Sequence, residues 1–192
     1  MARLIATAAL TATAVALAHP AFAHTGAGAV HGYGAGFLHP LTGLDHQLTM
    51  VAVGLWGAQR GGKFLWALPA TFVSVMAVGA GIGMAGVPLP LIEEGILLSV
   101  VALGAAVGLN TRLPMWMSLA GVALFAICHG YAHGAEMPEG ASGFQYLTGF
   151  ATATALLQTI GVGAGLALAR LKAVPWLGWG IASAGVALAL GG

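Results

Sequence analysis

The sequence has very little charge. Only 6% of its 192 residues are Asp, Glu, Lys or Arg, whereas a soluble domain carries about 25%. So few charged groups cannot cover a water-facing surface, which excludes an ordinary soluble domain. The net charge is +1, so nothing indicates a nucleic-acid partner. Because Cys128 is the only cysteine, no disulfide can form within the chain.

Apolar residues take the place of the missing charge. They make up 59% of the chain, and its 31 glycines stand among Leu, Val and Ala, which is typical of closely packed membrane helices. Six apolar segments each approach the ~20 residues that a helix needs to cross a bilayer. We therefore expect an all-α, polytopic membrane helical bundle with six transmembrane helices, which form a single domain over residues 24–192. The expected spans are 41–58, 64–85, 91–109, 113–133, 144–169 and 174–190.

The first 23 residues have the three parts of a secretory signal peptide. Arg3 supplies the positive start, residues 4–17 the apolar run, and Ala21-Phe22-Ala23 the cleavage site. A retained membrane helix is the alternative, but the apolar run is short for a span. Cleavage would make His24 the first mature residue. The Gly- and Ala-rich residues 24–36 are predicted to be a flexible or re-entrant lead-in without an element of its own.

Charge tests this topology independently. If residue 24 lies outside, alternation puts the 59–63, 110–113 and 170–173 connections in the cytoplasm. These connections contain every Lys and Arg of the mature chain, as the positive-inside rule requires. All acidic residues and all mature histidines fall at or near the opposite face. We therefore predict a multi-pass protein of the cytoplasmic (inner) membrane with both mature termini in the periplasm.

Two clusters of ionisable residues interrupt the apolar segments. The first contains His39, Asp45 and His46. Pro40 suits the first position of the helix over 41–58, so His39 lies at or just outside its start. Residues seven apart return to nearly the same helical face, which relates His39 to His46. Asp45 points about 100° away from His46, and could either bind a ligand directly or orient His46.

The second cluster has helical spacing. His129, His133 and Glu136 follow i, i+4, i+7 and form one stripe if the helix continues to Glu136. Both clusters lie toward the outer ends of their spans, so we expect them to converge. Imidazole with carboxylate suits Ni²⁺, Co²⁺, Zn²⁺ or Cu²⁺ better than Mg²⁺ or Ca²⁺. A single intramembrane histidine is usually structural, but six such groups at one depth favour a metal site.

Other polar residues leave two interpretations open. After cleavage, His24 would offer an α-amine and an imidazole to a metal, or would belong to a mobile terminus. Glu93 and Glu94 either stabilise the start of the helix over 91–109 or attract cations. Gln47, Gln158 and Met50 either line an ion path or serve helix packing.

The two motifs together resemble those of the HupE/UreJ family, H-x5-D-H followed by F-H-G-x-[AV]-H-G-x-E. The resemblance extends over nearly the whole chain, and Cys128 stands where the family pattern has Phe. It implies a nickel permease associated with hydrogenase or urease maturation, with some relatives linked to cobalt. It also implies a set of metal-handling residues, which coincides with the two clusters: His39, Asp45, His46, His129, His133 and Glu136.

These observations predict an uptake permease and not an enzyme. Its substrate would be a divalent transition metal, with Ni²⁺ favoured by the resemblance and Co²⁺ or Zn²⁺ as alternatives. Its partners would be membrane lipid, the metal ion and nickel-enzyme maturation proteins. Three other classes stay open: a zinc-hydrolase-like intramembrane enzyme with Glu136 or Asp45 as general base, a metal sensor or chaperone, and a b-type haem protein. The carboxylates beside the histidines argue against haem.

Overall fold

The computed structural model describes residues 32–191, and within this range the chain is helical without a β-strand. The predicted signal peptide over residues 1–23 and the candidate ligand His24 lie outside the described residues. The elements are α2 (Tyr33–Leu38), η1 (His39–Leu41), α3 (Leu44–Arg60), α4 (Phe64–Met84), α5 (Ile92–Gly108), α6 (Met115–Ala135), α7 (Gly143–Leu168), η2 (Ala169–Leu171) and α8 (Val174–Gly191).

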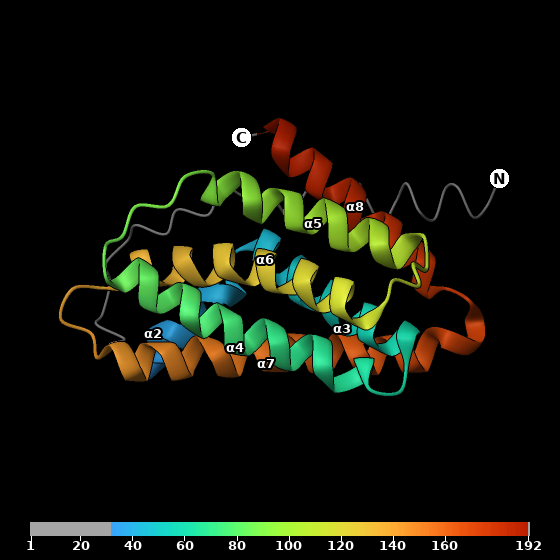
Figure 1. Ribbon diagram of the computed structural model, residues 1–192, viewed down its shortest axis with the longest axis horizontal. Coiled ribbons are helices and arrows are strands. Elements are labelled where there is room, and N and C mark those ends of the chain that lie inside the picture. The colour runs from blue at the N-terminus through green and yellow to red at the C-terminus, as the bar shows by residue number, and fades with distance from the viewer. Residues whose placement is uncertain (1–31, 192) are drawn as a thin grey trace.

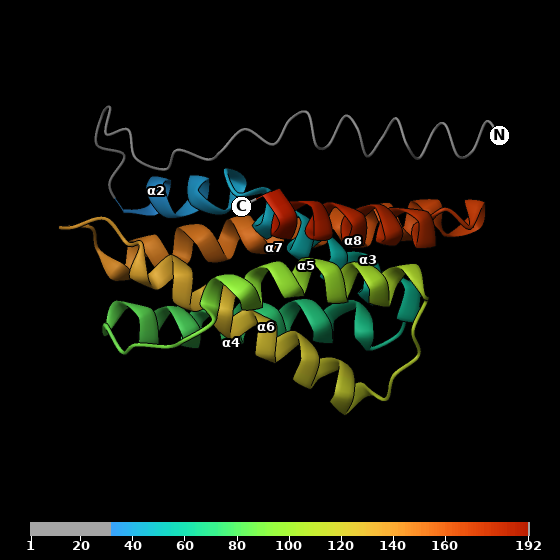
Figure 2. The same cartoon turned by 90° about the horizontal axis from the view of Figure 1, so that it is seen from above.

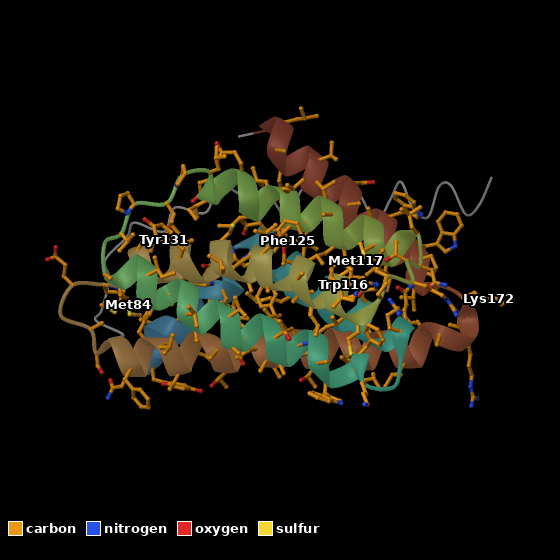
Figure 3. All side chains as sticks on the ribbon, viewed as in Figure 1. Met84, Trp116, Met117, Phe125, Tyr131 and Lys172 are labelled. Carbon is orange, nitrogen blue, oxygen red and sulfur yellow. The ribbon has the colours of Figure 1, made fainter. Side chains whose placement is uncertain are left out.

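The long helices run back and forth between two ends of the bundle. The α3–α4, α5–α6 and α7–α8 connections lie at one end, and the α4–α5 and α6–α7 connections lie at the other (Figure 1). The first end contains Lys63, Arg112 and Lys172, and we call it the basic end. Figure 3 places Trp116 near this end and Met84 and Tyr131 toward the opposite end. The opposite end, which contains His39 and the C-terminus of α6, is the histidine end.

Helix α3 is the centre of the bundle. It contacts α4, α5, α7 and α8, and every residue from Thr49 to Gly57 except Val51 is buried. Around it, α4 packs on α6, α5 on α8, and the short α2 along α7 (Figure 2). The core therefore forms where α3 meets its neighbours, and includes Met50, Phe72 and Phe150.

Glycine allows the closest helix contacts. Gly130 and Gly134 of α6 face the carbonyl oxygens of Met76 and Ala80 on α4, and a Cβ at either glycine would overlap those oxygens. Glycines at such contacts let two backbones approach closely in a membrane protein. The glycine-rich composition therefore serves packing, as predicted.

The bundle surface is apolar. Trp116 is 71% exposed and Leu124 is 63% exposed, so large side chains face outward where a soluble protein would place charge. Trp66, Trp116 and Trp176 are exposed near the basic end, which suits a membrane–water interface. Among residues 32–191, four helical segments are long and apolar enough to cross a membrane: Phe64–Met84, Met115–Ala135, Gly143–Leu171 and Val174–Gly191.

The predicted helix boundaries are close to the observed ones. The last five predicted segments agree with α4 to α8 within two residues at each end. Helices α3 and α5 have 17 residues each, which is the lower limit for a span. Six crossing helices therefore remain a prediction, although an all-helical membrane protein is established.

Two local predictions were wrong. The first span begins at Leu44, because Pro40 belongs to the 3-10 helix η1 and Gly43 is extended, at φ −90° and ψ 118°. The lead-in over 24–36 was expected to have no element, but α2 begins at Tyr33. Gly36 of α2 packs against the backbone of Tyr146 on α7. This tertiary contact supports a short helix that propensity alone would not favour.

Candidate metal centre

The first ionisable cluster straddles a break in the chain. His39 lies in η1, whereas Asp45 and His46 lie in the first turn of α3. Thr42 closes the turn between them, because its Oγ1 donates to the His39 carbonyl oxygen at 2.7 Å. His39 and His46 therefore do not share one helix. We predicted from their seven-residue spacing that they lie on one helical face, and that argument was wrong, although both residues lie near the same site.

The second cluster is held by packing on two sides of α6. His129 and His133 are fully buried, and the adjacent Gly130 and Gly134 press the helix against α4. The ring of His133 stacks on Phe150 with a centroid separation of 5.0 Å. Glu136 is the residue that caps the end of α6, one position beyond the helix, and its side chain is 55% exposed.

The two clusters meet at the histidine end. The ring centroid of His46 lies 4.6 Å from that of His129 and 4.6 Å from that of His133. The ring centroid of His39 lies 4.8 Å from that of His133. Four imidazoles from η1, α3 and α6 thus form one group, which we call the histidine cluster: His39, His46, His129 and His133. Their common depth in the predicted spans anticipated this meeting.

Each carboxylate of the two motifs contacts one imidazole. Asp45 Oδ1 accepts from His46 Nδ1 at 2.8 Å and from the His46 backbone N–H at 2.7 Å. These are the contacts that orientation of His46 by Asp45 would require. Glu136 Oε2 lies 2.9 Å from His39 Nε2. This hydrogen bond holds the pKa of the Glu136 carboxyl below its usual value, and partial burial opposes the shift.

The histidine cluster contains buried nitrogens that nothing satisfies. His46 Nε2, His129 Nδ1 and both ring nitrogens of His133 are buried and have no hydrogen-bond partner. Leaving such an atom unpaired costs about 1–3 kcal/mol, so each one calls for an explanation. Within residues 32–191, no three His, Cys, Asp or Glu side chains are arranged as a ready metal site.

Two residues beside the cluster were not predicted. Ser99 Oγ of α5 lies 2.8 Å from His129 Nε2, and Thr49 Oγ1 of α3 lies 2.9 Å from Ser99 Oγ. All three side chains are fully buried. The signal in the sequence was a hydroxyl within each of two apolar segments, since hydroxyls in membrane helices often bond across to a neighbour. Spacing alone could not show that both hydroxyls lie beside His129.

The remaining polar candidates make none of the contacts described above within the histidine cluster. Gln47 Nε2 donates to the Leu41 carbonyl oxygen at 2.7 Å, so this side chain links α3 to η1. Gln158 of α7 is 1% exposed and neither of its amide atoms has a partner. Glu93 and Glu94 lie in the first turn of α5, as predicted. Cys128 Sγ lies beside Gly95 of α5.

Comparison with known proteins adds a family. The chain matches the HupE / UreJ protein family over residues 10–188. It is 40% identical to Protein HupE of Rhizobium leguminosarum bv. viciae, across 95% of this chain and 97% of that protein. No solved structure matches the chain.

Proposed function

The chain belongs to the HupE/UreJ family, and from this premise we propose that it is a Ni²⁺ uptake permease of the cytoplasmic membrane. In this role it would supply nickel for the maturation of hydrogenase or urease. The family is one of permease-like accessory proteins, which supports transport over catalysis. Nickel, as opposed to Co²⁺ or Zn²⁺, follows from the family resemblance, since imidazole and carboxylate accept all three ions.

We propose six spans after a cleaved signal peptide, with the histidine end toward the periplasm. The support is the distribution of charge and tryptophan: Lys63, Arg112 and Lys172 lie at the basic end together with exposed tryptophans. Basic connections are typical of the cytoplasmic side. Helices α3 and α5 are short, but α3 is surrounded by other helices, so its ends need not reach both lipid–water boundaries.

The observation that carries the proposal is the set of unpaired, buried ring nitrogens. A lone pair on neutral imidazole is a metal ligand, and His46, His129 and His133 each present at least one nitrogen without a partner. We propose that these three side chains capture the ion from the periplasm. His39, Asp45 and Glu136 would orient the rings or complete the ligand set, and His24 would add a ligand if cleavage exposes it.

An inward route is supported by one face of α7. Tyr146, Phe150, Thr154 and Gln158 recur every four residues and are all buried, so they form a stripe that leads from the histidine cluster toward the basic end. Phe150 stacks on His133 at its outer part. Further in, the unpartnered amide of Gln158 supplies an oxygen that could receive a cation after it leaves the imidazoles.

The test is uptake of radioactive nickel by cells that lack other nickel importers. Replacing His46 or His133 with Ala should lower uptake at least about tenfold, the scale expected when a metal site loses a ligand or its support. Thr159→Val is the matched control, because Thr159 is exposed on α7 and donates only to the Ala155 carbonyl oxygen. Nickel accumulation would also separate a permease from the intramembrane hydrolase alternative.

Equal expression of all variants must be verified by immunoblot. Normal uptake in both histidine variants would overturn the proposal. Competition of the same uptake by Co²⁺ and Zn²⁺ then ranks the substrates, and weaker inhibition by these two ions than by unlabelled Ni²⁺ would support nickel.

A further inference from the structure

A buried chain of hydrogen bonds leads away from the histidine cluster. His129 Nε2 lies 2.8 Å from Ser99 Oγ, which lies 2.9 Å from Thr49 Oγ1. Ser99 Oγ also donates to the Ile96 carbonyl oxygen, one turn earlier in α5, at 2.6 Å. The chain joins α6, α5 and α3, and its three side chains are fully buried.

Counting hydrogens assigns a direction to each bond. A hydroxyl has one hydrogen and two lone pairs, and a carbonyl oxygen can only accept. The hydrogen of Ser99 therefore goes to Ile96, and its two lone pairs accept from Thr49 and from His129. It follows that His129 carries a hydrogen on Nε2. In the neutral ring the lone pair is then on Nδ1, which is the His129 nitrogen that has no partner.

We propose that Ser99 is a positioning residue that fixes the tautomer of His129 and so presents Nδ1 to the metal ion. This inference rests on the proposed function, since it needs His129 to act as a ligand. Thr49 completes the arrangement by donating to Ser99 and filling its last lone pair. Without Ser99, the ring could carry its hydrogen on Nδ1, and the hydrogen would point where the ion has to bind.

The neighbouring histidine has the opposite arrangement. Asp45 accepts from His46 Nδ1 at 2.8 Å, which leaves Nε2 of His46 as the unpartnered atom. The two rings, with centroids 4.6 Å apart, thus offer different nitrogens because different neighbours hold the other one. Metal-binding histidines commonly donate their second ring N–H to a nearby acceptor. Here a carboxylate has that role for one ring and a serine hydroxyl has it for the other.

A purely structural role does not require this arrangement. Ser99 could satisfy its hydroxyl on Ile96 alone, as Ser118 of α6 does on Pro114 at 3.2 Å. Ser118 is equally buried and therefore provides a matched control. The contacts to His129 and Thr49 are additional, and they link the serine to a ring with a free nitrogen.

The experiment uses the full-length protein in detergent micelles with ¹⁵N-labelled histidine. Nitrogen chemical shifts of the metal-free protein report the tautomer, and His129 should carry hydrogen on Nε2. Ser99→Ala should convert this signal to a mixture of tautomers and weaken Ni²⁺ binding, measured by titration calorimetry, by about tenfold. Thr49→Val should weaken binding less, because Ser99 still accepts from His129. Ser99→Thr keeps the hydroxyl, so it should retain the wild-type tautomer of His129 and the wild-type nickel affinity. Ser118→Ala should change neither the tautomer nor the affinity.

The outcomes separate this proposal from the proposed function. If wild-type His129 carries its hydrogen on Nδ1, the tautomer assignment is wrong whatever the protein transports. If the wild type binds nickel and Ser99→Ala binds it equally well, the positioning role fails while the permease proposal stands. If the wild-type protein binds no nickel, the proposed function itself fails. Thermal unfolding of each variant, measured in parallel, shows whether Ser99→Ala stays folded. If it does not, the nickel affinity of Thr49→Val replaces that of Ser99→Ala in the comparison with the wild type.

Discussion

The two ends of the bundle use their polar side chains differently. At the basic end, Arg60 Nη1 donates to the Leu113 carbonyl oxygen at 2.7 Å and Gln59 Nε2 donates to the Val107 carbonyl oxygen at 3.0 Å. These bonds tie the end of α3 to the last turn of α5 and to the connection between α5 and α6. At the histidine end, the ring nitrogens of His133 are fully buried but have no partner.

This contrast separates groups that maintain the fold from groups that remain free to bind. Apart from Gln59 Oε1, the polar side-chain atoms named at the basic end donate to backbone carbonyl oxygens of a neighbouring segment. Unpaired buried nitrogens destabilise a bundle. Their concentration around His133 is the reason for our proposal that binding of a ligand, and not folding, satisfies them.

The largest effect on this contrast is expected from His133→Leu. It removes two unpaired buried nitrogens and retains an apolar side chain beside Phe150. We expect the metal-free protein to become more stable by about 1–3 kcal/mol, while its nickel affinity falls about 100-fold. Thermal unfolding in micelles and titration calorimetry measure the two effects.

Nickel itself is the control for His133→Leu. Saturating nickel should raise the unfolding temperature of the wild type, because a ligand at 100 times its Kd contributes about 2.7 kcal/mol, and should leave the variant nearly unchanged. A variant that is less stable than the wild type without metal would mean that His133 supports the fold. The contrast between the two ends would then be lost.

A smaller effect is expected from changing the helix contact that holds the histidines. Gly130→Ala places a Cβ against the Met76 carbonyl oxygen, so α6 must move away from α4. Overpacking of this kind costs about 1–3 kcal/mol, and it should also weaken nickel binding because His129 moves with the helix. Gly121→Ala is the control on the same helix, because no atom lies near a Cβ at that position.

Equal stability of Gly130→Ala and Gly121→Ala would show that the α4–α6 contact is not close enough to position the site. Thermal unfolding in micelles compares the stabilities of the two variants. Titration calorimetry with the same series of nickel concentrations compares their nickel affinities.

Much of this arrangement could be predicted from the sequence. Charge and hydropathy located the long helices, and the sorting of Lys63, Arg112 and Lys172 to one end agrees with the alternation of the helices. The i, i+4 spacing placed His129 and His133 on one face. These properties depend on local periodicity and on charge near helix ends, both of which the sequence states directly.

The rest depended on contacts between distant segments. The break at Gly43 followed from η1 forming before α3, and α2 formed because Gly36 packs on α7. Ser99 and Thr49 are fifty residues apart in the chain, and no local pattern links them to His129. Hydrogen-bond direction in the cluster likewise requires knowing which acceptor each ring faces.

The smallest expected effect comes from Arg60→Met at the basic end. This change removes the bond to the Leu113 carbonyl oxygen and the contact with Phe64, over whose ring the guanidinium lies at 4.0 Å. Because Arg60 is partly exposed, we expect a loss of only about 1 kcal/mol, with nickel affinity unchanged. Arg170 is an exposed arginine at the same end, and Arg170→Met should change neither the stability nor the nickel affinity.

If Arg60→Met instead weakened nickel binding as His133→Leu does, the two ends would be coupled. The basic end would then take part in holding the ion, because a local loss of stability at that end cannot by itself alter a site built from η1, α3 and α6 at the other.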